Sequence, residues 1–336
     1  MKKGALFLLA VLLIVVSGCK KNDISNDSIV TINPLCFIAE EDSATIGINF
    51  YGLLDPLLNI EFSYDGNFWE RFVPDSIITL KNIGDKVYFR GNNPRGLNVN
   101  YESTYRHLYF LTNDKKIAAS GNIMSLIDPT CKSRIVPDNC FLGLFEETSI
   151  TSAPELPAIV LGRNCYASMF GHCSNLIAAP ELPATSLADG CYNSMFNACI
   201  NLTKVPDELP ATVLKPDCYV GMFYGCQSLI EAPKLPATTL VTGCYAFMFS
   251  ACASLISAPE LPATELADYC YSNMFGFCTN LNSIKVYFTG WNGESEAATT
   301  CWVYNVAPTG MFYCPRSLYL EFGNNRVPEG WEIKTF

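Results

Sequence analysis

The chain has 336 residues, of which 49% are hydrophobic and 16% are charged, and its formal net charge is −10. An apolar fraction near one half is typical of folded domains and excludes a disordered chain, and the length leaves room for two domains. The acidic balance argues against nucleic acid as a partner, because phosphate neutralisation needs clustered Lys and Arg. Only two histidines, His107 and His172, occur, and their separation excludes an HExxH zinc motif.

The N-terminus carries a short apolar segment. Lys2 and Lys3 precede an apolar run from Ala5 to Val16, and Ser17-Gly18-Cys19 follows before the sequence turns polar. Such a run is too short to span a bilayer, and small residues at its end are typical of a processing site. The segment resembles a bacterial lipoprotein signal with its lipobox, the alternative being an ordinary signal peptide. The resemblance implies a signal peptide over residues 1–18, lipid attachment to Cys19, a tether over residues 19–30, and membrane contact through the N-terminal lipid only.

Residues 31–130 have the pattern of β-strands. "SATIGINFYG" alternates apolar and polar residues, and two apolar runs flank Asp65-Gly66, which is a hairpin turn signal. Turn signals recur at short intervals without long helical stretches between them. The pattern predicts a small β-sandwich of the immunoglobulin or fibronectin kind.

Residues 131–336 are built from a repeat. The unit is Cys-Tyr-x-x-Met-Phe-x-x-Cys-x-x-Leu followed by Ala-Pro-Glu-Leu-Pro-Ala-Thr, and its first cysteines recur at spacings of 26, 27, 26 and 26 residues. These cysteines are Cys165, Cys191, Cys218, Cys244 and Cys270. The copy that starts at Cys140 matches the unit only in part, and "CWVYNVAPTGMFYC" from Cys301 matches it weakly. A fixed period of this length predicts a solenoid of stacked coils with a C-terminal cap.

Each coil is expected to contain a helical turn and a short strand. Cys191, Met195, Cys199 and Leu202 fall on one stripe of a helical wheel, and Asn164 or Asp217 stands where a helix N-cap belongs. In "APELPAT" two prolines keep the strand short, with the leucine pointing inward and the residue before it pointing outward. The predicted fold class is therefore α+β, with a β-sandwich followed by a leucine-rich-repeat solenoid.

The repeat, with its phenylalanine, following cysteine and leucine before a short strand, resembles the leucine-rich repeats of the BspA-like surface lipoproteins of Bacteroides and relatives. The resemblance covers roughly Cys140 to the C-terminus, including the closing "NNRVPEGWEIKTF". It implies a cell-surface location on the outer membrane and a role in cell adhesion through protein binding. Display on the outer surface and location on the periplasmic face both stay open.

No catalytic motif is found, and we expect no enzyme activity and no cofactor. The sequence lacks GxSxG, a P-loop and a Rossmann fingerprint. It also lacks CxxC, so we expect no metal. Lipidation of Cys19 would leave fifteen of the sixteen cysteines, and these are expected to form mostly reduced, buried ladders in which cysteine acts as a small hydrophobic residue.

Two surfaces are candidates for binding. The outward column of the strand segments is the first, and a host or microbial surface protein would be its partner; its residues are Glu155, Glu181, Glu208, Lys234 and Glu260. A column of tyrosines is the second, and it would stack on glycans if its rings are exposed; its residues are Tyr166, Tyr192, Tyr219, Tyr245 and Tyr271. The alternative to both is a structural spacer that binds no ligand.

Overall fold

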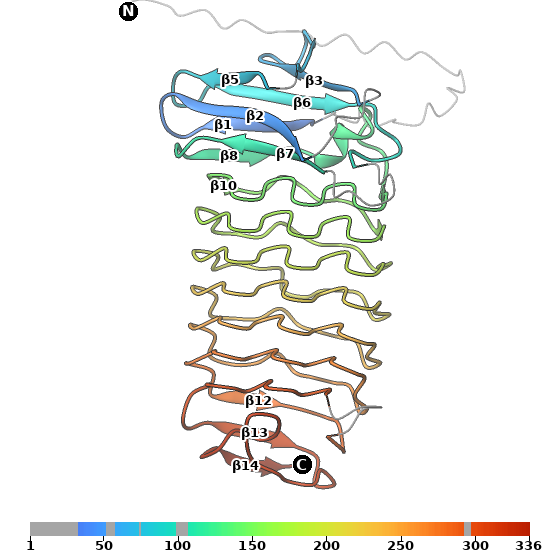
Figure 1. The fold of residues 1–336 in the computed structure, drawn as a ribbon, viewed down its shortest axis with the longest axis vertical. Helices are drawn as coiled ribbons and strands as arrows, with labels where there is room; N and C mark the ends of the chain where they lie inside the picture. Colours follow the sequence, from blue (N-terminus) through green and yellow to red (C-terminus); the bar gives the residue numbers. More distant parts are fainter. Residues whose placement is uncertain (1–32, 52–57, 74, 99–106, 292–296) are drawn as a thin grey trace, which may run out of the picture. The chain divides into compact units, whose positions relative to one another are not determined.

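The computed structural model describes residues 33–51, 58–73, 75–98, 107–291 and 297–336 (Figure 1). The predicted signal peptide, Cys19 and the tether lie outside the described residues. The described residues belong to one compact unit that begins at Asn33.

Two sheets form the N-terminal part of this unit. A six-stranded sheet has the order β10-β8-β1-β6-β3-β4, and a three-stranded sheet has the order β5-β2-β7. The bounds are β1 Leu35–Ala39, β2 Ala44–Tyr51, β3 Ile60–Ser63, β4 Glu70–Arg71, β5 Ile77–Leu80, β6 Lys86–Gly91, β7 His107–Thr112, β8 Ile117–Ser120 and β10 Ile150–Ser152. Alternating buried residues along β6 and β7 give each strand one core face. Phe37 and Phe89 of the larger sheet meet Phe110 of the smaller sheet, with ring centroids 4.9 and 5.2 Å away from Phe110.

The first coil closes the open side of these sheets. Strand β10 pairs in parallel with β8, with Ile150 opposite Ile117. The ring of Phe145 stacks on Phe110 at 5.4 Å, and the Phe110 amide donates to the Leu144 carbonyl at 2.8 Å. A four-residue 3-10 helix, η1 (Ile123–Leu126), is buried beside this junction. The aromatic core therefore continues from the sheets into the coils.

The repeats form parallel coils stacked below the sheets (Figure 1). Short strands pair between coils near both ends: β9 (Ile135–Val136) with β11 (Val160–Leu161), and β12 (Ser283–Lys285) with β13 (Met311–Cys314) and β14 (Glu332–Thr335). Between these ends the pairing is reduced to single bridges such as Ala178 with Lys204 and Glu208 with Lys234. Prolines explain the reduction, because each one removes a backbone donor.

The cysteine-rich segments are turn ribbons, not helices. We define the turn ribbons as Cys165–Cys173, Cys191–Cys199, Cys218–Cys226, Cys244–Cys252 and Cys270–Cys278. Backbone amides alternate between two partners along each ribbon. Asn193 donates to Gly190 three residues back at 3.0 Å, whereas the adjacent Tyr192 donates to Cys218 of the next coil at 3.0 Å. Half of the hydrogen bonds thus close turns within a coil, and half join neighbouring coils.

The predicted α+β class is wrong, because the described residues contain no α-helix and the fold is almost entirely β. Every fourth residue of a ribbon has a left-handed backbone, as Gly190, Ser194 and Ala198 show with φ of 61°, 54° and 56°. Right-handed helices exclude such residues. Asn164 and Asp217, expected as N-caps, also take the left-handed conformation, with φ of 49° and 54°.

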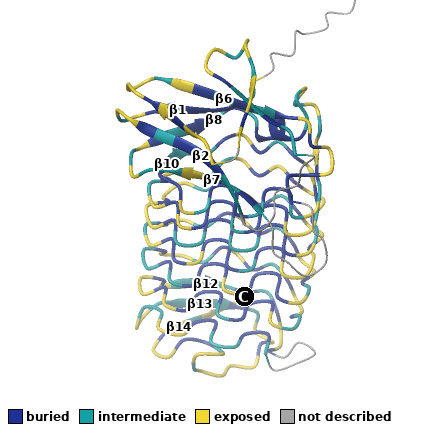
Figure 2. Cartoon of the chain, turned by 45° about the horizontal axis from the view of Figure 1, so that its top comes forward, coloured by how far each residue is buried: buried dark blue, intermediate teal, exposed yellow. Residues whose placement is uncertain are grey.

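The ribbons bury pairs of residues at a period of four. Figure 2 shows buried and exposed positions alternating along each coil. Phe196 and Phe223 stack at 5.6 Å with nearly parallel planes, and equivalent pairs run from Phe145 to Phe275. At the C-terminal end the Tyr271 amide donates to Ala298, so Ala298 takes the place of the first cysteine and Trp302 takes that of the methionine. The register expected from Cys301 is therefore wrong by three residues.

Candidate functional site

The outward column of the strand segments is exposed over five consecutive coils. Leu156, Leu182, Leu209, Leu235 and Leu261 are buried. The residue before each leucine is exposed: Glu155, Glu181, Glu208, Lys234 and Glu260. Backbone bridges between coils hold these positions in register, as the pair Glu208 and Lys234 shows. This confirms the predicted inward and outward directions and places the five side chains on one fixed surface.

The charges of this column differ in how they are paired. Glu260 accepts from Lys285 Nζ at 2.8 Å and from Tyr287 Oη at 3.3 Å. The Lys285 hydrogen bond lowers the pKa of Glu260, and the same contact raises the pKa of Lys285 to about 12. No ion pair among the described residues includes Glu155, Glu181 or Glu208. Three carboxylates therefore lie on successive coils without an ion pair, and Lys234 follows Glu208 on the next coil.

A groove of about 420 Å³ lies beside the first two of these carboxylates. Pro154, Pro157, Pro180 and Pro183 line it, with Glu155, Glu181 and Arg134 among its polar residues. Arg134 is held in place by a 2.8 Å hydrogen bond from Nη1 to the Pro157 carbonyl. Apolar walls with carboxylates nearby suit a long basic side chain, whose stem can cover apolar surface while its head stays polar.

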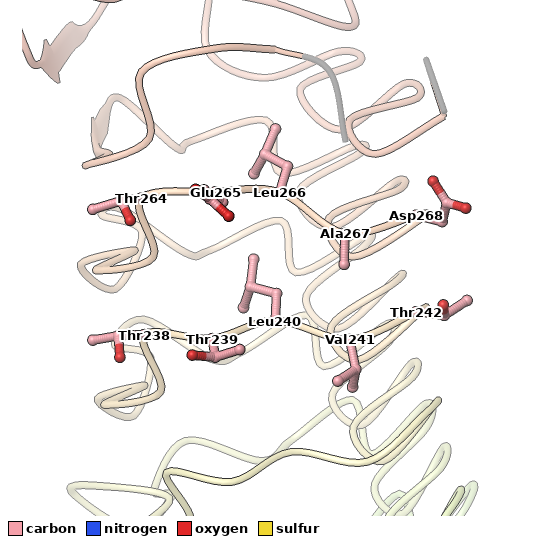
Figure 3. Close-up of a pocket in the computed structure, with 10 residues that line it drawn as sticks. All are labelled: Thr238, Thr239, Leu240, Val241, Thr242, Thr264, Glu265, Leu266, Ala267 and Asp268. Atoms are coloured by element: carbon pink, nitrogen blue, oxygen red, sulfur yellow. The ribbon is translucent and has the colours of Figure 1, made fainter. Parts of the chain in front are cut away.

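Two more grooves lie between neighbouring coils. One of about 580 Å³ is lined by charged residues that include Lys204, Asp207, Glu231 and Lys234. The other, of about 570 Å³, lies between Thr238–Thr242 and Thr264–Asp268. Figure 3 shows these two segments running in parallel, with Leu240 beside Leu266 in the stack. Thr238 matches Thr264, whereas Glu265 and Asp268 stand where the preceding coil has Thr239 and Thr242, so the two coils differ in charge.

The tyrosine column is part of the core and cannot stack on glycans. Tyr166, Tyr192, Tyr219, Tyr245 and Tyr271 are at most 2% exposed. Their rings stack on one another at 5.6 to 6.1 Å. Burial raises the pKa of each phenol well above its usual value. The proposed glycan-stacking role is wrong for these residues, because their faces are covered by the neighbouring rings.

The second cysteine of each ribbon has a hydrogen-bonding role. The thiol of Cys199 donates to the Phe170 carbonyl of the preceding coil at 3.0 Å, and Cys226 donates to Phe196 at 3.2 Å. Equivalent bonds occur at Cys173, Cys252 and Cys278. All fifteen described cysteines are unpaired. Burial raises the pKa of Cys173 and Cys278 to about 12, so the donor proton is retained at neutral pH.

The described residues show neither a metal site nor a membrane-spanning helix. Within the described ranges no cluster of three His, Cys, Asp or Glu residues could hold a metal ion. The same ranges contain no helix of the length and hydropathy needed to cross a membrane. The lipidation of Cys19 falls outside these ranges and stays a prediction, as do the absence of catalysis and of cofactors.

The sequence did not reveal a group of exposed aromatic residues, three on the turn ribbons and one, Tyr304, on the equivalent segment that starts at Ala298. Tyr224, Phe247, Phe277 and Tyr304 are 42%, 40%, 51% and 43% exposed, respectively. Because a four-residue period buries the first two residues of each four, the third and fourth residues point outward. Reading the ribbon at that period would have separated these aromatics from the buried Tyr and Phe columns.

Comparison of the chain with protein-family models, curated proteins and solved structures finds no match in any of the three.

Proposed function

We propose that the protein is a non-catalytic, lipid-anchored surface protein of the outer membrane that binds a basic segment of a host or microbial protein. Glu155, Glu181 and Glu208, exposed on successive coils without ion-pair partners among the described residues, carry the proposal. Carboxylates on successive coils repel one another. A partner with Lys or Arg side chains would relieve this repulsion and be steered to the surface by it.

The shape of the surface fits this partner. The proline-lined groove at Glu155 and Glu181 offers apolar walls to a Lys or Arg stem. The coil backbone is fixed by hydrogen bonds between coils, so little order is lost when a partner binds. The apolar segment before Cys19 supports membrane attachment, and the resemblance to BspA-like surface proteins supports adhesion and surface display.

The proposal is tested by binding to immobilised matrix proteins that carry basic segments. The chain Lys20–Phe336 is compared with Glu181→Gln/Glu208→Gln and with the control Glu70→Gln/Glu329→Gln, which changes the net charge equally at exposed sites elsewhere. We expect the column variant to bind at least about tenfold more weakly and to lose most of its salt dependence. Equal effects of the two variants would show that net charge alone matters, and the absence of binding would leave a spacer as the better explanation.

A further inference from the structure

Four consecutive turn ribbons carry no charged residue. Their sequences are "CYNSMFNAC", "CYVGMFYGC", "CYAFMFSAC" and "CYSNMFGFC", beginning at Cys191, Cys218, Cys244 and Cys270. On the strand side of the same coils, Lys204, Glu208, Glu231, Lys234 and Glu260 are exposed. The molecule thus has two chemically different faces. The ribbon face has the neutrality of a contact surface, since charged residues are depleted where interfaces are buried.

Large aromatic side chains project from this uncharged face, whose other residues are mostly small. Phe247, Phe277 and Tyr304 are 40 to 51% exposed, whereas the ribbon residues Ala246, Ser250 and Ser272 are buried. Phe277 and Tyr304 meet edge to face at 5.1 Å. The Phe247 amide donates to Ser272 in the coil that carries Phe277, at 2.8 Å. Three aromatic rings on three consecutive coils therefore belong to one ribbon face.

Two of these aromatics occupy backbone positions that do not favour them. Phe247 and Phe277 have φ of 57° and 63°. At the first position other coils place Gly143, Ser168, Ser194, Gly221, Asn273 and Cys301, and at the second Glu147, His172, Ala198, Gly225, Ala251 and Asn305. A bulky side chain in the left-handed region is strained, and its exposed ring gains little burial in return. Packing within the coils therefore does not explain why phenylalanine occurs at these two positions.

We propose that the ribbon face bearing Phe247, Phe277 and Tyr304 binds an uncharged glycan. The electron-rich face of an aromatic ring attracts the polarised C–H bonds of a sugar, and these three side chains are 40 to 51% exposed. Asn305 is exposed directly after Tyr304 and can hydrogen-bond to hydroxyls through its amide, whereas Asn273 Nδ2 already donates to Ser272 Oγ at 3.2 Å. A neutral face suits a neutral ligand, and the net charge of −10 disfavours anionic polysaccharides. This site is separate from the acidic column and does not depend on it.

The variant that tests the proposal takes its residues from neighbouring coils. The substitutions are Phe247→Ser, Phe277→Ala and Tyr304→Ser. Each introduces the residue that another coil has at the equivalent position, namely Ser194, Ala251 and Ser250. The matched control is Tyr64→Ser/Phe68→Ser/Tyr319→Ser, which removes three aromatics that are 58 to 81% exposed elsewhere. Binding of the chain Lys20–Phe336 is measured by affinity electrophoresis and calorimetry on soluble β-glucan, mannan and galactomannan, with heparin and polygalacturonate as anionic probes.

We expect the unaltered chain to bind at least one neutral polysaccharide. The ribbon variant should bind it about tenfold or more weakly, and its unfolding midpoint should be unchanged or higher. The control and Glu181→Gln/Glu208→Gln should bind normally, which separates this proposal from that of the acidic column. Binding of anionic probes alone, no glycan binding, or equal losses in variant and control would overturn it. The proposal would also be overturned if the ribbon variant lost binding together with a lowered unfolding midpoint. Self-association of the unaltered chain in sedimentation that the ribbon variant abolishes would overturn it as well.

Discussion

The Asp217 carboxylate fills the space beside Gly243 where any other residue would place its Cβ atom. Gly243 also has a φ of 63°, so both its conformation and its neighbour in the preceding coil require glycine. Asn164 and Gly190 show the same relationship one pair of coils earlier. From Asn164 to Gly243 the stack thus alternates a polar side chain with a glycine that makes room for it.

Replacing Gly243 with alanine is expected to lower the free energy of unfolding by about 2–3 kcal/mol, as strain and overlap combine. Gly225→Ala is the control, because its φ of 70° is strained but its nearest neighbour lies 3.7 Å away. It should cost only about 1 kcal/mol. Denaturant titration measures both, and Asp217→Gly should recover part of the Gly243→Ala loss. Equal costs for the two alanines would contradict the proposed overlap.

Truncating a stacked phenylalanine is expected to be far more costly than truncating its exposed neighbour. Phe223 is fully buried between Phe196 and Phe249, at 5.6 and 5.7 Å. Phe223→Ala should lose about 3–5 kcal/mol of unfolding free energy. The adjacent Tyr224→Ala removes an exposed ring and should change it by about 0.5 kcal/mol or less. Chemical denaturation followed by circular dichroism compares the two, and similar losses would show that the stacking is not a main stabilising contact.

Stability is expected to fall steeply at alkaline pH. Burial raises the pKa of six thiols to about 12, at Cys140, Cys173, Cys191, Cys218, Cys270 and Cys278. Above about pH 9 the unfolded chain loses these protons while the folded chain keeps them, so unfolding is favoured as pH rises. Each thiol contributes about 1.4 kcal/mol per pH unit.

Together the six thiols lower the free energy of unfolding by about 8 kcal/mol per pH unit above about pH 9. By about pH 11 the accumulated loss exceeds a typical total stability of 5–15 kcal/mol. Thermal unfolding from pH 7 to pH 11 in reducing buffer measures the effect. The melting temperature should be nearly constant to pH 8 and then drop. A flat profile up to pH 11 would show that the thiols are not retained in their buried, protonated state.

Thiol reactivity should separate two cysteines from the rest. Cys131 and Cys301 are half-buried, whereas the other thirteen described cysteines are buried. In the folded protein Ellman's reagent should therefore modify only these two on a timescale of minutes, and Cys131 slowly, because burial raises its pKa to about 11. All fifteen should react in denaturant. Rapid modification of further thiols in the native protein, or in a Cys131→Ser/Cys301→Ser variant, would contradict the buried columns.

The sequence indicated which residues are equivalent but not the backbone that links them. The spacings from Cys165 to Cys270 identify residues that do stack, as Phe196 and Phe223 illustrate. Apolar residues at i, i+4 and i+8, however, fit both a helix stripe and a ribbon with a four-residue period. The separating signal was Gly190, Ser194 and Ala198, small residues at every fourth position, of which glycine tolerates a left-handed backbone best.

Other misjudgements follow from that choice of period. On a wheel Tyr192 lies at the margin of the apolar stripe, which favoured burial without deciding it; on the ribbon it belongs to the buried pair with Cys191. The C-terminal register also failed because Ala298 and Trp302 replace the cysteine and methionine that mark a repeat. Direction along the strand side was predictable, since Leu182 and Glu181 follow simple alternation.

The alternating hydrogen bonds of the turn ribbons have a mechanical consequence. A bond such as that from Tyr192 to Cys218 joins successive coils, whereas one such as that from Asn193 to Gly190 lies within a coil. Tension applied between the two ends of the stack loads the first kind and spares the second. Coils would detach singly, each releasing about 26 residues, or roughly 90 Å of extended chain. Single-molecule pulling should show evenly spaced steps of that length, and a single rupture would refute it. Under the proposed surface attachment, such a stack would lengthen in small increments under shear.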